Sequence, residues 1–134
     1  MQFKGKRIFV VDDEPTARNI LSAILVHDGA LIYFNRFEHE ASVSEQILQW
    51  MPIDLIILDL RLPKGVTGYD VFKQIQTVPE LLTIPIIATT AFHPSEHIER
   101  TKAMGFNGLI SKPIRVNVLR NCVSQVLDGN SVWS

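Results

Sequence analysis

Charged and polar side chains follow several of the apolar runs in this 134-residue chain. Asp12 and Asp13 come directly after the first run, and Asp59 ends the segment "DLIILD". Thr90 ends a later segment, "PIIATT", and Lys112 follows "GLIS". Adjacent carboxylates at the end of a buried strand repel each other unless a positive charge lies close to them. These residues are therefore the first candidates for chemistry.

A divalent cation is the compensation that we expect for three carboxylates in one cleft. Mg²⁺ binds oxygen ligands in an octahedron and usually keeps several waters, so it suits a few carboxylates with an open side. Such a site favours a phosphoryl ligand, because the metal and the Lys112 ammonium both neutralise phosphoryl oxygens. The residue types thus predict a magnesium site that can receive a phosphoryl group.

Two alternating patterns predict the elements that position these residues. Near-continuous apolar runs, typical of strands covered on both faces, occupy residues 8–11, 31–34, 55–58, 84–88 and 108–110. Helical periodicity is clearest at Ala17, Ile20, Leu21, Ile24 and Leu25, and again at Val116, Leu119, Val123 and Val126. Helices near residues 38–51, 68–77 and 95–104 fill the remaining gaps. The pattern predicts a doubly wound α/β fold, whose site lies at the carboxyl ends of parallel strands.

Composition excludes several classes of protein. Thirteen basic residues nearly balance fourteen acidic ones, which argues against a nucleic-acid-binding face. No apolar run approaches the length of a membrane span, and the first residues do not resemble a signal peptide. The single cysteine, Cys122, cannot form an internal disulfide. We therefore expect a cytoplasmic protein that binds neither nucleic acid nor membrane.

Four motifs carry a specific resemblance. The stretches "VVDDEP", "LIILDLRLP", "ATTA" and "SKP", in this order and spacing, resemble the receiver domain of two-component response regulators. The resemblance covers roughly residues 6–127 and implies a chemotaxis-regulator-like fold. That fold is a flavodoxin-like three-layer sandwich with a five-stranded parallel sheet of order 2-1-3-4-5. We expect a single receiver domain over residues 1–134, with a core at about 6–127 and a C-terminal tail at 128–134.

The resemblance implies a role for each acidic residue. Asp59 matches the phosphoacceptor, which becomes an acyl phosphate. Asp13 matches the direct Mg²⁺ ligand, and Asp12 its acidic neighbour, which often acts through water. Asp59 and the backbone carbonyl of Arg61 complete the implied set of protein ligands for the metal.

The resemblance also implies a switch. Thr90 matches the hydroxyl that binds the phosphoryl group, and Lys112 matches the lysine that pairs with the acceptor or its phosphate. Pro113 matches a proline whose preceding peptide is cis. Leu109 departs from the family, because the switch position three residues before the lysine is usually aromatic. The loop after Asp59 is also one residue longer than usual.

The expected function is that of a phosphoacceptor, not of a conventional enzyme. Asp59 would receive a phosphoryl group from a histidine kinase or phosphotransfer protein in a Mg²⁺-dependent reaction, and the domain would assist its own phosphorylation and dephosphorylation. The altered face would then bind an unknown downstream protein, and the family also allows a homodimer. A bulky ring at Phe92 predicts slow loss of the phosphoryl group.

Two alternatives stay open at this point. A degenerate receiver would act as a protein-binding module without being phosphorylated. A haloacid-dehalogenase-type phosphatase needs Asp-x-Asp-x-Thr after the first strand, whereas this chain has "DDEPT". Elsewhere we expect surface positions for His93 and His97 and no chemistry at Asn35. We also expect a disordered Trp133.

Overall fold

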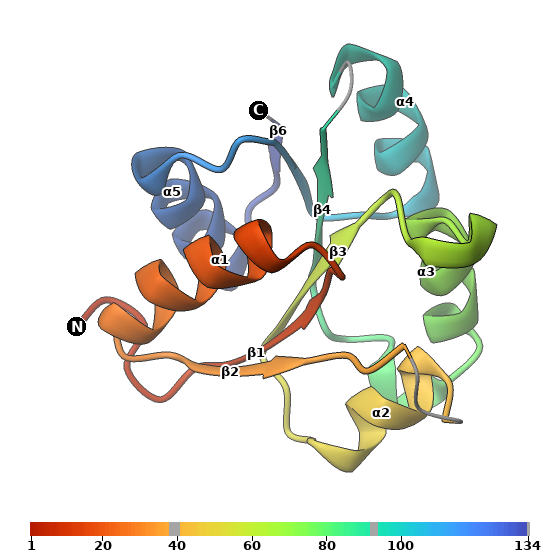
Figure 1. The fold of residues 1–134 in the computed structure, drawn as a ribbon, viewed down its shortest axis with the longest axis horizontal. Helices are drawn as coiled ribbons and strands as arrows, with labels where there is room; N and C mark the ends of the chain where they lie inside the picture. The colour runs from red at the N-terminus through yellow and green to blue at the C-terminus, as the bar shows by residue number, and fades with distance from the viewer. Residues whose placement is uncertain (38–40, 92–93, 134) are drawn as a thin grey trace.

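A single parallel sheet forms the centre of the molecule (Figure 1). The computed structural model describes residues 1–37, 41–91 and 94–133. Its strands are β1 (Arg7–Val11), β2 (Leu31–Phe34), β3 (Leu55–Asp59), β4 (Ile86–Thr90), β5 (Gly108–Ser111) and β6 (Val132–Trp133). They lie in the order β2-β1-β3-β4-β5-β6, and every pairing is parallel. The predicted doubly wound fold and the order of its five strands are confirmed.

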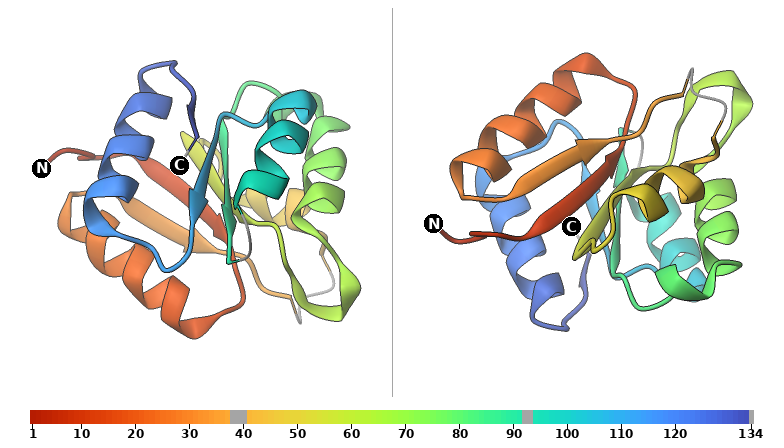
Figure 2. Two further views of the ribbon diagram at one scale, coloured as in Figure 1. Left: turned by 90° about the horizontal axis from the view of Figure 1, so that it is seen from above. Right: turned by 90° about the horizontal axis from the view of Figure 1, so that it is seen from below.

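Helices cover both faces of this sheet, as right-handed crossovers between parallel strands require. The helices are α1 (Pro15–His27), α2 (Val43–Gln49), α3 (Gly68–Gln76), α4 (Pro94–Met104) and α5 (Val116–Leu127). Short 3₁₀ turns, η1 (Pro63–Gly65) and η2 (Pro79–Leu81), follow β3 and α3. Figure 2 shows α1 and α5 on one face and α2, α3 and α4 on the other. No described helix has both the length and the apolar character needed to cross a membrane.

Alternation along the strands creates two apolar layers. In β3, Leu55 and Ile57 face the core beneath α1 and α5, whereas Ile56 and Leu58 face the core beneath α2, α3 and α4. Each of these side chains is fully buried or nearly so. Burying one such side chain stabilises the fold by about 1.5–3 kcal/mol, so the near-continuous apolar runs specify a strand that is covered twice.

Two element boundaries differ from the sequence prediction. β4 begins at Ile86, not Ile84, because Pro85 has no N–H for the ladder, and the amide oxygen of Asn107 accepts the N–H of Ile86 at 2.9 Å. The predicted helix over 38–51 is shorter at its start, where the Ser42 hydroxyl caps α2 by accepting the N–H of Glu45.

The tail contains a sixth strand that we did not predict. Val132 and Trp133 pair with Gly108 and Leu109 of β5. Trp133 is half-buried and packs against the core beneath α4, with the Lys102 ammonium 5.3 Å from its ring centroid. The expectation of a disordered Trp133 was therefore wrong, because ring burial and strand pairing offset the cost of ordering this short segment.

Candidate functional site

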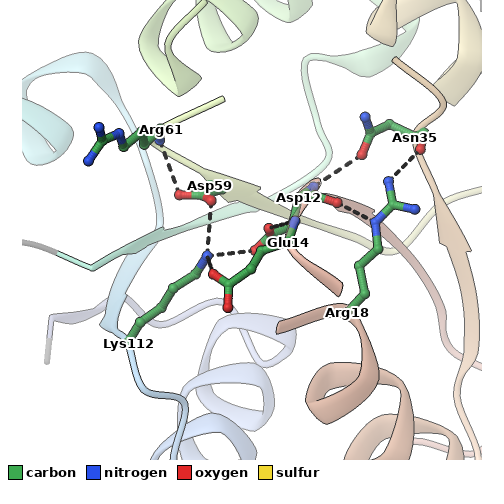
Figure 3. A network of polar contacts seen from close by, with 7 residues as sticks. All are labelled: Asp12, Glu14, Arg18, Asn35, Asp59, Arg61 and Lys112. Atoms are coloured by element: carbon green, nitrogen blue, oxygen red, sulfur yellow. Dashed lines mark hydrogen bonds and ion pairs between the residues drawn. The ribbon is translucent and has the colours of Figure 1, made fainter. Parts of the chain in front are cut away.

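Three carboxylates from two strand ends converge at the carboxyl edge of the sheet, and Figure 3 shows two of them, those of Asp12 and Asp59. Asp12 and Asp13 follow β1, and Asp59 ends β3, which is the strand beside it. One oxygen from each side chain lies within 4.8 Å of the others. Asp12 is 1% exposed and Asp59 5% exposed, whereas Asp13 faces solvent. The convergence that was expected from the strand-end rule is present in the structure.

Lys112 supplies the positive charge that these carboxylates need. Its Nζ lies 2.9 Å from Asp12 Oδ2, 3.0 Å from Asp59 Oδ2 and 3.4 Å from Glu14 Oε2. Figure 3 shows the ammonium directed at all three groups. One ammonium thus faces several carboxylates, so the cluster keeps an excess of negative charge.

This excess of negative charge is reflected in two pKa shifts. Burial raises the pKa of Asp59, and repulsion by Asp12 adds to the rise, while hydrogen bonds from the Arg61 N–H and Lys112 offset it only in part. Burial alone would lower the pKa of Lys112, but hydrogen bonds to Asp12 and Asp59 and their negative charges raise it overall. Both groups hold protons more tightly than usual, so the site favours additional positive charge.

Hydrogen bonds hold both the side chain and the backbone of Asp12. Its Oδ1 accepts the N–H of Glu14, the residue before the first turn of α1, at 2.9 Å. Its own N–H donates to Asn35 Oδ1 at 3.1 Å, and its carbonyl accepts from Arg18 Nε. Asn35, where we expected no chemistry, contacts the site through main-chain atoms of Asp12, and the expectation itself stays a prediction.

The loop after Asp59 folds back on itself. The N–H of Arg61 donates to Asp59 Oδ1 at 3.1 Å, and Arg61 forms an antiparallel bridge with Thr67. Lys64 in η1 adopts a left-handed conformation with φ of 61°. This turn lets the loop close before α3 begins, whereas the greater length of the loop relative to the family stays a prediction.

The ends of β4 and β5 complete this edge of the sheet. Thr90 is buried, and its carbonyl accepts the N–H of Lys112 at 2.7 Å. The peptide between Lys112 and Pro113 is cis. Leu109 is fully buried in the core beneath α4, and it pairs with Ala88 on one side and Trp133 on the other. The switching roles of Thr90 and Leu109 remain predictions.

An open pocket of about 530 Å³ lies beside the carboxylates. Its lining comes from the ends of β1 and β3, the loop after β3, and the segments after β4 and β5: Asp13, Glu14, Pro15, Asp59, Arg61, Leu62, Pro63, Ala91 and Lys112. The pocket has room for several waters and a small anionic group next to Asp59. Phe92 lies outside the described residues, so its predicted effect stays a prediction.

The donor set fits a hydrated Mg²⁺. Ligand oxygens at about 2.1 Å from this ion can be at most about 4.2 Å apart, so oxygens within 4.8 Å of one another need only small side-chain movements. A bridging water at Asp12 would relax the geometry further. The oxygen donors, the partly open pocket and the excess negative charge all agree with the cofactor that the sequence predicted.

Histidine placement differs from the sequence prediction. His97 is half-buried, and its Nδ1 lies 2.7 Å from the hydroxyl of Tyr69 on α3. His93 lies outside the described residues. His97 therefore contributes to the packing of α4 on α3, and the expected surface position was wrong for this residue.

Fold and site together define a doubly wound α/β domain with an acid cluster and a facing lysine at the carboxyl edge of the sheet. The family model of the response regulator receiver domain matches residues 8–124. The chain therefore belongs to the receiver domain family of two-component signalling.

Similar proteins differ widely in length. Chemotaxis protein CheY-3 of Vibrio cholerae is 28% identical over 127 residues, which cover 93% of this chain and 94% of CheY-3. Sensor histidine kinase RcsC of Salmonella typhimurium is 28% identical over 117 residues, which cover 87% of this chain but only 12% of RcsC. A 14.6 kDa protein of Leptolyngbya boryana is 31% identical over 80% of this chain and 79% of its own length.

Solved structures share the fold. The receiver domain of a signal transduction histidine kinase from Syntrophus aciditrophicus superposes with a TM-score of 0.75 at 30% identity, covering 93% of this chain and 92% of that one. Chemotaxis protein CheY4 of Vibrio cholerae gives a TM-score of 0.78 at 24% identity, covering 91% of this chain and 98% of that one. The second likeness concerns the fold alone.

Proposed function

We propose that residues 1–134 form one receiver domain that accepts a phosphoryl group on Asp59 in a Mg²⁺-dependent reaction. The observation that carries this proposal is the placement of the Asp59 carboxylate, which faces Asp12 and Lys112 and lines an open pocket. A histidine kinase or phosphotransfer protein is the proposed donor, and we place the exchange in the cytoplasm, where ATP supplies such kinases.

In the proposed step, one carboxylate oxygen of Asp59 forms a bond to phosphorus. The bond from phosphorus to the donor's imidazole nitrogen breaks, and the nitrogen keeps the electron pair. The product is an acyl phosphate on Asp59. Lys112 lies close enough to pair with an oxygen of the new phosphoryl group, since it already contacts Asp59 Oδ2.

Asp13, Asp12, Asp59 and the backbone carbonyl of Arg61 are the proposed ligands of Mg²⁺. When bound, the ion neutralises charge on the phosphoryl oxygens. The residues of this chain hold Asp59 in place for the reaction: Arg61 binds one carboxylate oxygen and Lys112 the other. Burial excludes most water from both Asp12 and Asp59.

Phosphorylation would act by shifting an existing conformational equilibrium. We propose that Thr90 responds to the new phosphoryl group and that Leu109 repacks in the core beneath α4. A downstream protein, or a second copy of the chain in a homodimer, would then bind the altered face. Leu109 is enclosed between β4 and β6, so any repacking must also involve Trp133.

Labelling with acetyl phosphate tests this function. We expect Mg²⁺-dependent transfer of ³²P to the wild-type chain and to Asp128→Asn, a control at an exposed aspartate after α5. Asp59→Asn should stay unlabelled, and hydroxylamine should release the label from the wild type, as it does from acyl phosphates. Absence of label on the wild type would instead support the degenerate binding module. Steady hydrolysis of p-nitrophenyl phosphate would support a phosphatase.

A further inference from the structure

Asp12 depends on two side chains that lie behind the acid cluster. Asn35 follows β2 and is fully buried, and its Oδ1 accepts the N–H of Asp12 at 3.1 Å. Arg18 on α1 donates through Nε to the carbonyl of Asp12 and through its terminal nitrogen to the carbonyl of Asn35 at 2.8 Å. Figure 3 shows both residues on the side of Asp12 away from Asp59 and Lys112.

These contacts replace the backbone hydrogen bonds of the strand ladder, which ends before Asp12. β1 stops at Val11, so the N–H and carbonyl of Asp12 have lost their regular partners while the residue is still buried. A buried backbone group without a partner costs free energy comparable to a lost hydrogen bond. Side chains from two other elements fill both positions, and they thereby fix the direction in which the chain leaves the sheet.

That direction determines where the carboxylates of Asp12 and Asp13 point. We propose that Arg18 and Asn35 are positioning residues that hold the backbone of Asp12 so that both carboxylates face Asp59 before any ion binds. Neither residue contacts Asp59. The inference rests on the proposed function, because its readout is the affinity of the site for Mg²⁺.

Charge and geometry make opposite predictions for Arg18. If the guanidinium acted only through its charge, Arg18→Met would remove repulsion and Mg²⁺ would bind more tightly. If it acts by positioning, Arg18→Met should weaken Mg²⁺ binding by roughly tenfold or more, as loss of residues that orient metal ligands does. Asn35→Ala changes no charge, so a loss of affinity in that variant cannot be electrostatic.

Arg7 provides a matched control at the opposite end of β1. Its Nε donates to the carbonyl of Pro52 at 2.6 Å, its terminal nitrogen donates to the carbonyl of Trp50 at 2.7 Å, and its guanidinium lies 4.9 Å from the ring centroid of Tyr33. Arg18 likewise binds two carbonyls and lies 5.0 Å from the ring centroid of Phe34. Arg7→Met therefore loses the same kinds of contact without disturbing Asp12.

The experiment is calorimetric titration of the full chain with MgCl₂ alone. We expect weaker binding by Arg18→Met and by Asn35→Ala, unchanged binding by Arg7→Met, and partial recovery in Arg18→Lys. Because Arg18 also holds the carbonyl of Asn35, the double variant should lose less than the sum of the two single losses. If Arg18→Met does not fold, Asn35→Ala and Arg18→Lys decide the question.

The outcomes separate the two proposals. A wild-type chain that binds no Mg²⁺ overturns the proposed function and this inference with it. A wild type that binds Mg²⁺, together with folded Arg18 and Asn35 variants that bind as tightly or more tightly, overturns only the positioning role.

Discussion

The Lys112 ammonium contributes directly to the charge balance of the site. Lys112 contacts Asp12 and Asp59 at about 3 Å, and both of those carboxylates are almost fully buried. Burial and mutual repulsion raise the pKa of Asp59 in spite of this contact. The excess of negative charge in the cluster is therefore electrostatically unfavourable, and a bound cation would relieve it.

Asp59→Asn should stabilise the apo protein at pH 7. The folded pKa of Asp59 lies above its unfolded value, so the wild type loses stability as the pH rises from about 4 through the folded pKa. We expect Asp59→Asn to melt a few degrees higher at pH 7 without Mg²⁺, with a much smaller difference near pH 3.5. Thermal melts across this pH range measure it, and an Asn variant that melts lower at pH 7 would contradict the argument.

Lys112→Met should have the opposite effect. It leaves two buried carboxylates without a counter-charge, which costs about 3–5 kcal/mol for a buried pair. The loss should shrink at pH 5, since Asp59, whose pKa burial raises, can then take up a proton more readily, and Mg²⁺ should restore part of the stability. Urea unfolding measures both effects, with Lys73→Met on the exposed side of α3 as the control. An equal loss in both variants would refute the role of Lys112.

Residue types at strand ends were enough to predict this cluster. Asp12, Asp59 and Lys112 stand at the carboxyl ends of parallel strands, and the topology brings those ends together. Arg18 and Asn35 could not be predicted in the same way, because they contact main-chain atoms of Asp12. Such contacts depend on how α1 rotates against the sheet, which the pattern of apolar residues specifies only coarsely.

At the scale of elements, the approach of α3 to β3 sets the position of Asp59. Gly68 begins α3, and a Cβ atom there would lie 2.8 Å from the Cα of Leu60 and closer still to the carbonyl oxygen of Asp59. Both obstacles are backbone atoms, which cannot move aside as a flexible side chain can. At Gly68 the chain therefore passes β3 with no room for a side chain.

Gly68→Ala should therefore destabilise the protein and disturb Asp59. The clash with backbone costs about 1–3 kcal/mol, typical of overpacking, and it should also slow labelling by acetyl phosphate. Chemical denaturation and labelling rates measure the two effects. Gly68 does not lie in the left-handed region, so its replacement adds the clash without that strain. Gly65→Ala, whose Cβ would meet no atom within 4 Å, adds left-handed strain without a clash and serves for comparison. Wild-type stability and labelling in Gly68→Ala would show that α3 is free to shift.

Boundaries of elements were predicted less well than their existence. Thr67 and Asp70 form a capping box at the start of α3, and the prediction of residues 68–77 was close to the observed helix. The β4 boundary moved because Pro85 lacks a donor and Asn107 supplies an acceptor from another segment. The capping box, formed by neighbouring residues, therefore defined the start of α3, whereas the contact with the distant Asn107 helped to define the start of β4.

At the scale of the whole molecule, two apolar cores hold the sheet between its helices. Cys122 on α5 is fully buried in the core beneath α1 and α5, and burial raises the pKa of its thiol to about 12. The salt bridge from Arg120 to Asp28, with Nε to Oδ2 at 2.8 Å, joins the two helices that cover this core. Solvent should reach the thiol only when this layer opens.

Cys122 should therefore report on unfolding of the molecule. At pH 8 we expect a disulfide-exchange reagent to label the native protein at least about 10³-fold more slowly than a free thiol, because both exposure and ionisation require opening. Labelling in guanidinium should be immediate. Rapid labelling of the native chain would show that α5 opens without the rest of the fold.

The strand order of the main sheet followed from the resemblance and the alternation of apolar and helical patterns. β6 did not, since Val132 and Trp133 stand in a polar stretch too short to show any periodicity. The pairing of β6 depends on the free edge of β5 and on an apolar surface beside α4. Both exist only once β5 and α4 are in place.

One consequence concerns the borders of the sheet. Peptides often recognise domains by docking alongside an unpaired strand and extending its ladder. On the β5 border that place is already taken, because Val132 and Trp133 lie against Gly108 and Leu109. An incoming peptide would have to displace these two residues, whereas among the described residues no strand pairs with the outer border of β2.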